Sequence, residues 1–305
     1  MAGLNKAYLE ITNVCNLRCD FCPGTRREKG FLSPDGFRTL TQKLRPHVQY
    51  LYLHLMGEPL LHPDLPELLN IAGEQGFKVI ITTNGTLLPQ QVQLLASSSA
   101  VHKISVSLHS FEGNESHDVD LSRYLDNCIE AVKLLSSKGK ICALRLWNLD
   151  GQTTHGANAS NGDILQKLEA AFPKPWKENL RGFTLAPKVY LEWGEKFEWP
   201  DLSAEEGGGG IFCYGLRDQI GVLWDGTVVP CCLDHEGDIP LGNLYEQTLD
   251  EILNSPRAKA MYDSFSCRKA VEELCRKCGY ARRFQDGGHH GKRSQPQRYS
   301  QGIRL

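Results

Sequence analysis

Three cysteines near the N-terminus have the spacing of a metal-binding loop. Cys15, Cys19 and Cys22 form the pattern C-x3-C-x2-C in the run VCNLRCDFC, and the aromatic residue Phe21 precedes the third cysteine. Clustered thiolates suit zinc or iron–sulfur clusters, and a closed zinc site needs a fourth ligand that this set lacks. Three thiolates can instead hold three irons of a [4Fe–4S] cube and leave the fourth iron open to a small molecule. The spacing therefore favours a reactive cluster, with zinc as the alternative.

A second group of cysteines lies in the C-terminal third of the chain. Four of them have the grouping of one ligand set: Cys213, Cys231, Cys275 and Cys278. The segment Ile220–Val229 is typical of a hairpin turned at Trp224, Asp225 and Gly226, which would bring Cys213 and Cys231 together. A zinc ribbon fits four thiolates as well as an iron–sulfur cluster does on spacing alone, so both interpretations stay open at this point.

The remaining cysteines have less definite roles. Cys232 is an alternative ligand to Cys231, and Cys267 is a spare that could exchange as a ligand or face the substrate. Cys128 and Cys142 fall in a helix pattern and a strand pattern, where cysteine usually serves as a buried apolar filler.

The composition describes an ordinary globular protein. The 305 residues are 41% hydrophobic and 23% charged, with a formal charge of −2, so no strong attraction to nucleic acid or membrane is expected. No segment approaches the roughly 18 apolar residues of a membrane span, and the N-terminus lacks an apolar signal core. We expect a cytoplasmic protein, in which grouped cysteines indicate metal binding rather than disulfides.

Strand patterns alternate with helix patterns over the first two thirds of the chain. The expected strands are Lys6–Thr12, Tyr50–Leu55, Lys78–Thr82, Lys103–Leu108, Ile141–Trp147 and one between Arg181 and Leu191. The expected helices run from Ser33 to Arg45, Asp64 to Gln75, Pro89 to Ser98, Ser122 to Ser137 and Gly162 to Ala171. This order predicts an α/β fold of parallel strands with right-handed crossovers and a site at the strand C-terminal ends. The pattern alone does not separate a partial barrel from a doubly wound sheet.

The regular order breaks in the acidic and glycine-rich run around residues 192–210. The predicted division is a core of residues 1–200, a linker 201–210, a cluster-binding domain 211–284 and a polar, basic tail 285–305. In that tail His289 and His290 could bind metal, but a solvated segment is the favoured interpretation.

The first cysteine motif resembles that of the radical S-adenosylmethionine (SAM) superfamily. The resemblance implies that the open iron of a [4Fe–4S] cluster binds SAM and that reductive cleavage gives a 5′-deoxyadenosyl radical, which abstracts a hydrogen atom from the substrate. It also implies an electron donor such as flavodoxin or ferredoxin. Its fold, a partial (β/α)6 TIM-like barrel, decides against the doubly wound sheet.

The segment MGEPLLHP matches a SAM-binding element of the same superfamily. Gly57, Glu58 and Pro59 correspond to the last three residues of G-G-E-P, whereas Met56 replaces the first glycine. The resemblance implies that the Gly57 backbone and Glu58 lie near the SAM amine.

Two further strand ends carry polar residues. TTNGT ends the third strand, so we expect Thr82 and Asn84 to line the cofactor pocket. In ISVSLHS, alternation puts Ser105 and Ser107 on one face of the fourth strand, aimed into the barrel. Ser107 is the expected contact to the SAM ribose or carboxylate.

The fifth strand contains a charge among apolar residues. Burying the guanidinium of Arg145 is costly unless it meets an anion, and both the SAM carboxylate and an internal Asp or Glu stay open as that anion. His109 is expected at the mouth of the barrel as a proton relay, a substrate ligand or a hydrogen-bonded loop residue. Trp147 and Asn148 are the other candidates to face the substrate.

The segment from Cys213 to Gly279 resembles the SPASM/Twitch extension of radical SAM enzymes, including the phrase LGNLYEQTLDEI. A full SPASM domain adds C-x5-C-x3-C after the C-x2-C pair, and no cysteine follows Cys278 here. The resemblance therefore implies one small α+β domain with one auxiliary [4Fe–4S] cluster on Cys213, Cys231, Cys275 and Cys278. A fully ligated cluster is suited to accept an electron from a substrate radical.

The sequence thus predicts a radical SAM oxidoreductase that acts on a small polar metabolite or a peptide. One alternative is an RNA-modifying enzyme that uses basic tail residues, although the near-neutral charge argues against a large basic footprint. Those residues are Lys292, Arg293, Arg298 and Arg304. Another alternative is a non-catalytic electron-transfer or zinc-binding module.

Overall fold

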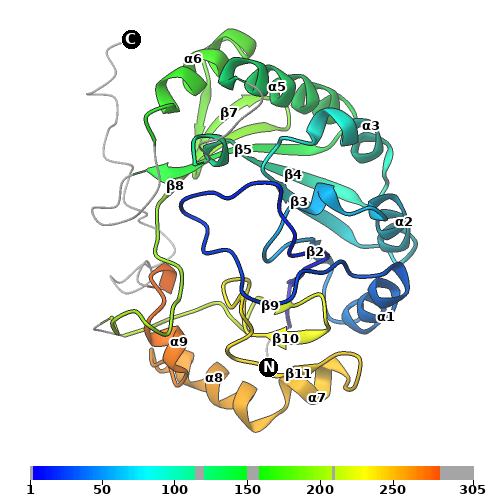
Figure 1. Ribbon diagram of the computed structural model, residues 1–305, viewed down its shortest axis with the longest axis vertical. Helices are drawn as coiled ribbons and strands as arrows, with labels where there is room; N and C mark the ends of the chain where they lie inside the picture. Colours follow the sequence, from blue (N-terminus) through cyan, green and yellow to red (C-terminus); the bar gives the residue numbers. More distant parts are fainter. Residues whose placement is uncertain (1–2, 114–119, 150–157, 208–209, 282–305) are drawn as a thin grey trace.

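The computed structural model describes residues 3–113, 120–149, 158–207 and 210–281. Its strands form one sheet in the order β11-β10-β9-β1-β2-β3-β4-β5-β8-β7-β6, which curves into an open partial barrel with helices outside it (Figure 1). The expected tail histidines and basic residues lie outside the described part. None of the helices in the described ranges combines the length and apolar character that a membrane crossing requires.

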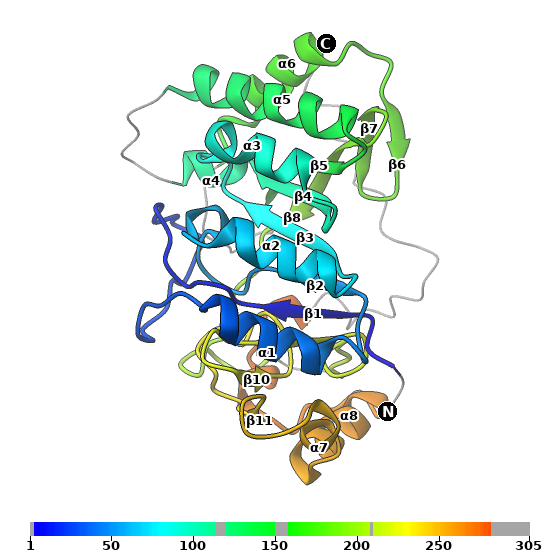
Figure 2. The same ribbon diagram turned by 90° about the vertical axis from the view of Figure 1, so that its right-hand side faces the viewer.

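Six strands of the sheet run parallel and form the barrel wall. These strands are β1 (Lys6–Leu9), β2 (Tyr50–Tyr52), β3 (Lys78–Thr83), β4 (Val101–Ser107), β5 (Ile141–Leu149) and β8 (Val189–Glu195). The covering helices are α1 (Pro34–Leu44), α2 (Leu65–Glu74), α3 (Leu88–Ser97), α5 (Leu121–Ser137) and α6 (Asn161–Ala171). Figure 2 shows α1, α2, α3 and α5 stacked along one side of the strands. The predicted partial (β/α)6 arrangement is confirmed.

Local sequence accounts for where these helices begin. Ser33 caps α1 by accepting a hydrogen bond from the backbone N–H of Gly36, and Pro34 occupies the first turn. Asp120 caps α5 in the same way through the N–H of Arg123.

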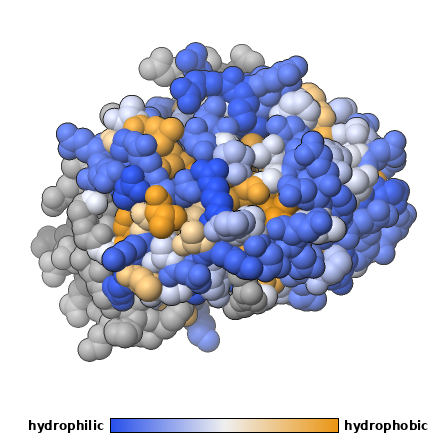
Figure 3. Space-filling view, turned by 90° about the horizontal axis from the view of Figure 1, so that it is seen from below, coloured by the Kyte–Doolittle hydropathy of each residue, from blue (hydrophilic) through white to orange (hydrophobic). Residues whose placement is uncertain are grey.

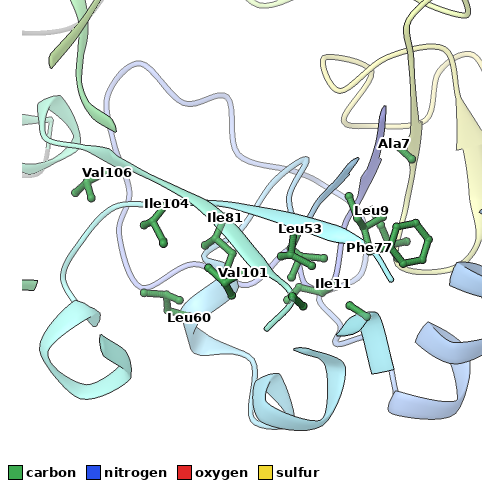
Figure 4. Packing of buried hydrophobic residues seen from close by; sticks show 14 of the residues in the cluster. Ala7, Leu9, Ile11, Leu53, Leu60, Phe77, Ile81, Val101, Ile104 and Val106 are labelled. Atoms are coloured by element: carbon green, nitrogen blue, oxygen red, sulfur yellow. The ribbon is translucent and has the colours of Figure 1, made fainter. Parts of the chain in front are cut away.

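The two faces of the barrel strands differ in chemistry. Side chains that point outward are apolar and pack beneath the helices, as Figure 4 shows for Leu53, Ile81 and Ile104. Side chains at alternating positions point inward and include Tyr8 and Arg145, which line a cavity. The fold therefore buries its apolar surface on the helix side and keeps polar groups inside the barrel.

One expected strand is wrong in its extent. The chain between 181 and 195 forms two strands, β7 (Gly182–Ala186) and β8, which pair antiparallel. They are separated at Pro187 and at Lys188, whose φ of +63° makes a tight turn. A third strand, β6 (Lys177–Asn179), pairs with β7 and forms one edge of the sheet.

The C-terminal region begins with the predicted hairpin. Its strands are β9 (Gln219–Val222) and β10 (Thr227–Val229), followed by β11 (Gly242–Asn243), α7 (Leu249–Leu253), α8 (Pro256–Ser266) and α9 (Glu273–Arg276). The pairing of β9 with β1 was not predicted, and it continues the barrel sheet in parallel.

Figure 3 views the molecule from below and shows a mostly hydrophilic face with apolar side chains gathered near its middle.

Candidate active site

Both groups of cysteines line one cavity of about 2690 Å³ inside the barrel. The N-terminal group lies in the loop after β1, and the C-terminal group comes from the hairpin region and the end of the described chain. The lining cysteines of the two predicted sets are Cys15, Cys19, Cys22, Cys213, Cys231, Cys275 and Cys278. The fold thus brings together seven thiols from segments far apart in sequence.

The N-terminal cysteine loop is folded by its own backbone. The N–H of Cys22 donates to the carbonyl of Cys19 at 3.1 Å, and the N–H of Leu17 donates to the sulfur of Cys15 at 3.5 Å. Burial raises the pKa of both Cys15 and Cys22. A bound metal displaces the thiol proton outright, so the raised pKa does not prevent these thiols from acting as ligands.

Gly57 allows the next loop to approach the cysteine loop closely. Its φ is +77°, and a Cβ at this position would lie 2.5 Å from the carbonyl oxygen of Thr12. The N–H of Glu58 donates to the carbonyl of Val14 at 2.8 Å, which ties the two loops together. Pro59 begins the short 3-10 helix η1 (Pro59–Leu61) and is buried, outside the set of cavity-lining residues.

Glu58 is a buried carboxylate at the wall of the cavity. It accepts hydrogen bonds from the N–H groups of Asn84 at 2.7 Å and Leu60 at 3.0 Å. Burial nevertheless raises the pKa of Glu58 to about 7. A cationic or hydrogen-bond-donating ligand next to this carboxylate would lower its pKa and favour its charged form.

Asn84 connects the turn after β3 to the cysteine loop. Its Nδ2 donates to Asn16 Oδ1 at 2.9 Å and lies 4.0 Å from the sulfur of Cys15. Its Oδ1 accepts from the hydroxyl and N–H of Thr86. Thr82 also lines the cavity, so both residues expected from the TTNGT turn reach it.

The two predicted serines of β4 have different surroundings. Ser107 lines the cavity, as the alternation predicts. Ser105 is fully buried outside the lining set, and its hydroxyl has no hydrogen-bond partner among the described residues.

Arg145 and Lys103 share one buried carboxylate. Lys103 Nζ lies 2.7 Å from Glu192 Oε1, whereas Arg145 Nε lies 3.4 Å from Glu192 Oε2. Arg145 also lies 3.4 Å from the hydroxyl of Thr82 and stacks over the ring of Trp147 at 4.5 Å. The internal carboxylate expected as one partner of Arg145 therefore exists. Lys103 and Arg145 together carry two positive charges, and Glu192 carries one negative charge. Because the shorter contact is that of Lys103, the group keeps a net positive charge next to Arg145.

His109 is held by the backbone of β5. Its Nδ1 lies 3.2 Å from the carbonyl of Arg145 and 3.4 Å from the N–H of Trp147, and its ring contacts Phe21. Burial lowers the pKa of His109 to about 4, so the imidazole is neutral. Among the three possibilities, these contacts favour the hydrogen-bonded structural role, although the ring does line the cavity.

Trp147 and Asn148 point to different places, because neighbours on a strand face opposite sides. Trp147 lines the cavity. Asn148 lies outside the lining set, and its amide exchanges hydrogen bonds of 2.9 and 3.2 Å with Asn161 at the start of α6. The expectation that Asn148 faces the substrate is therefore corrected: its side chain joins β5 to α6.

Sequence reasoning missed three residues that line the cavity: Tyr8 in β1, Tyr52 in β2 and His54 just after β2. The ring of Tyr8 lies 4.6 Å from that of Tyr52 and 5.4 Å from that of His54. The Nδ1 atom of His54 is buried with no hydrogen-bond partner among the described residues, and burial lowers its pKa to about 3. The alternation Tyr-x-Tyr-x-His from Tyr50 was the available signal, since it gives one strand a polar aromatic face.

The four C-terminal thiols influence one another directly. Burial raises the pKa of Cys231 well above its ordinary value, and the neighbouring thiols of Cys213, Cys232, Cys275 and Cys278 raise it further. Burial also raises the pKa of Cys275, followed by the thiols of Cys213 and Cys278 and the carboxylates of Asp234 and Glu272. The thiols of the predicted auxiliary set therefore lie near one another in the lining of the cavity.

The remaining cysteines differ in how close they lie to that set. Cys232 lines the same cavity and is near enough to raise the pKa of Cys231, so it remains an alternative to that ligand. It also hydrogen bonds to Tyr8, and burial raises its own pKa to about 11. Cys267 is exposed at the end of α8 and lies outside the cavity lining. Cys128 and Cys142 are fully buried in the apolar core, as predicted.

The donor sets fit iron–sulfur clusters. Soft thiols dominate both groups, in threes and in fours. Within the described residues, no three His, Cys, Asp or Glu side chains converge as ligands of a single ion would. A cube does not require such convergence, because each of its irons takes a separate thiolate.

Comparison with protein families matches both halves of the chain. Residues 9–158 match the radical SAM superfamily, and residues 213–279 match SPASM, an iron–sulfur cluster-binding domain. Both domains bind [4Fe–4S] clusters. The N-terminal match covers four of the six wall strands and the C-terminal match covers the whole hairpin region.

Individual relatives are more distant. The chain is 25% identical over 297 residues to the antilisterial bacteriocin subtilosin biosynthesis protein AlbA of Bacillus subtilis, covering 90% of this chain and 65% of that protein. Across the first curated relatives that it matches, the chain spans between 25% and 65% of their length.

Solved structures share the fold at low identity. BtrN in complex with AdoMet and 2-DOIA superposes with a TM-score of 0.58 at 18% identity, covering 91% of this chain and 94% of BtrN. Streptococcus suis SuiB bound to S-adenosylmethionine gives 0.59 at 18% identity, covering 91% of this chain and 72% of SuiB. With both family matches and this shared fold, the chain belongs to the radical SAM superfamily and carries a C-terminal SPASM domain.

Proposed function

We propose that the protein cleaves SAM reductively and oxidises a small polar metabolite or a peptide, with the auxiliary cluster as electron acceptor. The observation that carries this proposal is that both thiol sets line the same cavity. When bound, the cofactors supply a 5′-deoxyadenosyl radical that removes a hydrogen atom from the substrate.

The protein side chains orient SAM. Three thiols, Cys15, Cys19 and Cys22, would hold the cluster and leave one of its irons for SAM. Glu58, fixed by the N–H of Asn84, accepts a hydrogen bond from the SAM amine. Arg145 carries the positive charge that Lys103 leaves unbalanced, and this charge attracts the SAM carboxylate.

Ser107 and Thr82 complete the lining on this side of the cavity. Both hydroxyls can donate and accept hydrogen bonds, which suits the SAM ribose and carboxylate. Gly57 contributes its backbone, which the absence of a side chain brings close to the cysteine loop.

The auxiliary thiols are the reason we propose that the substrate is oxidised. Cys213, Cys231, Cys275 and Cys278 can occupy all four irons, so this cluster offers no open position to a substrate. With its cluster bound, the auxiliary set would supply an acceptor for the electron that the substrate gives up after losing a hydrogen atom and then a proton to a base or water. An external acceptor would have to take that electron away, and a flavodoxin or ferredoxin would supply the electron needed at the first set.

The size of the cavity supports either kind of substrate. SuiB has been solved bound to the precursor peptide SuiA, and BtrN was solved in complex with AdoMet and 2-DOIA. The cavity is lined by aromatic and polar side chains such as Tyr8, Tyr52 and Trp147, which suit a polar substrate. We place the boundary between the two domains at residues 201–210, and we propose a cytoplasmic location because unoxidised thiols are needed as ligands.

Anaerobic reconstitution with iron and sulfide tests the proposal. The reduced protein is incubated with SAM, and 5′-deoxyadenosine is measured by chromatography. We expect release in the wild type and in Cys267→Ala, whose thiol lies outside the cavity, and none in Cys15→Ala. Iron-free protein or absent 5′-deoxyadenosine would contradict a radical enzyme. Formation of S-adenosylhomocysteine with a methylated product would contradict the oxidation.

A further inference from the structure

The loop segments that follow the two sets of cysteines are bonded to each other. Residues 23–27 follow Cys22, and residues 233–236 follow Cys232. The N–H of Arg26 donates to Glu236 Oε1 at 3.0 Å, and Arg27 Nε donates to the carbonyl oxygen of His235 at 2.7 Å. Segments some 210 residues apart in the chain therefore touch directly beside both candidate clusters.

Arg27 is anchored on the barrel wall as well. Its Nη2 lies 2.7 Å from each carboxylate oxygen of Glu10, which directly follows β1. The side chain of Glu10 is completely buried, and that of Arg27 is 15% exposed. Glu10 also accepts from the N–H of Met56 at 3.3 Å, in the strand-end loop that leads to Gly57.

The cysteine loop has a separate closure of its own. Asn13 Nδ2 donates to the carbonyl of Glu28 at 2.8 Å, and Asn13 Oδ1 accepts from the N–H of Gly30 at 2.9 Å. These bonds join the two ends of the loop and do not involve the C-terminal region. Arg27, only 15% exposed, thus joins the loop both to the barrel and to the auxiliary region.

The chemistry of this junction calls for arginine. One planar guanidinium reaches a buried carboxylate and a backbone carbonyl in different directions, because its donors project in a fixed fork. A lysine has a single ammonium group and cannot hold both partners in that geometry. Removing the positive charge altogether would leave the buried Glu10 carboxylate without its counterion.

We propose that Arg27 is a positioning residue that fixes the SAM-cluster loop against the auxiliary-cluster loop and so sets the separation of the two clusters. The contact itself does not depend on the proposed function. Only its expected effect, on electron transfer from the substrate to the auxiliary cluster, rests on that function. The clamp itself is a property of the chain and can be tested without a substrate.

The test compares Arg27→Lys with Arg38→Lys in the full-length, anaerobically reconstituted protein. Arg38 forms an exposed ion pair with Glu74 at 3.2 Å on the outer helices and is the matched control. Hydrogen–deuterium exchange is measured on peptides covering residues 19–30 and 231–239. We expect Arg27→Lys to accelerate exchange about tenfold or more in both segments, since a bond to a charged group is lost, and Arg38→Lys to leave both unchanged.

A second readout is the magnetic interaction between the two reduced clusters, measured by pulsed electron paramagnetic resonance. Arg27→Lys should broaden the distribution of intercluster distances. The double variant Glu10→Gln with Arg27→Gln removes both charges of the pair, so it avoids the cost of an unpaired carboxylate and keeps the test valid if Arg27→Lys fails to fold. It should also loosen both segments.

Wild-type protection of residues 231–239 in Arg27→Lys and in the double variant would overturn the clamp, as would loosening confined to residues 19–30. The proposed function fails by a different result. A wild-type protein that holds iron but releases no 5′-deoxyadenosine would contradict radical chemistry, while the exchange data would still decide the role of Arg27.

Discussion

The N–H of Asn84 donates a 2.7 Å hydrogen bond to Glu58 Oε2, and this bond joins the loops that follow β2 and β3. Asn84 in turn reaches the sulfur of Cys15, so one chain of contacts runs from the buried carboxylate to the first cysteine. Parallel strands end at one edge of the sheet, which is why loops that follow different strands meet here. The proposed SAM site is therefore a product of strand order as much as of the motifs.

Glu58 should make stability depend on pH. Its pKa is about 7 in the folded protein because of burial, against 4.5 ordinarily. The folded state therefore binds the proton more tightly, and the unfolded state releases it first as pH rises. The contribution of Glu58 to the free energy of unfolding should fall between about pH 4.5 and 7, by at most about 3 kcal/mol.

Urea unfolding of the cluster-free protein at pH 5 and pH 8 checks this effect. Glu58→Gln removes the titration, so its stability relative to wild type should rise over this range. Glu67→Gln, at an exposed position of α2, is the control. Parallel pH profiles for wild type and Glu58→Gln would show that this carboxylate does not titrate as proposed.

Arg145→Met should weaken SAM binding more than it affects folding. Glu192 keeps its 2.7 Å partner Lys103 in this variant, so no buried carboxylate is left unpaired. The loss of a charged hydrogen bond should lower SAM affinity by about tenfold to a hundredfold. Equilibrium binding to the reconstituted protein measures the effect. An unchanged affinity together with reduced thermal stability would identify a purely structural ion pair.

Gly57→Ala should disrupt the packing of the loop that contains Gly57, Glu58 and Pro59 against the cysteine loop. The new Cβ would lie 2.5 Å from a backbone oxygen at a φ of +77°, so both strain and overlap oppose it. We expect a loss of about 2–4 kcal/mol in the free energy of unfolding. Gly162→Ala in α6 is the matched control, because nothing lies within 4 Å of its added Cβ. Equal stability of the two variants in chemical denaturation would contradict the tight approach.

Sequence patterns predicted the features that are local. The N-cap at Ser33, the alternation of β4 and the hairpin of β9 and β10 each depend on residues close together in the chain. The two cysteine sets were also found this way, because C-x3-C-x2-C and C-x2-C are short motifs. The structure adds that both sets face one cavity.

Long-range partners could not be read from the sequence. The pairing of β9 with β1 joins residues more than 200 positions apart. The ion pairs of Glu192 with Lys103 and Arg145 require three strands, β8, β4 and β5, to lie side by side. The surroundings of His109 and Asn148 depend on the β5 backbone and on Asn161 of α6, which are distant in sequence or on another element. Such contacts arise from tertiary packing, which local propensity does not encode.

Two cysteine variants separate the proposed roles of the clusters. Cys15→Ala should abolish SAM cleavage, because it removes one of the three thiols that hold the cluster with the open iron. Cys275→Ala should retain part of the cleavage if the auxiliary cluster acts only after hydrogen abstraction. The measurements are iron content and 5′-deoxyadenosine release from reduced protein under anaerobic conditions. Cys128→Ala, in the apolar core and outside both sets, controls for loss of a thiol. If Cys15→Ala and Cys275→Ala lose cleavage equally while both keep their fold, the auxiliary cluster takes part in the cleavage step, and the assignment of separate roles is wrong.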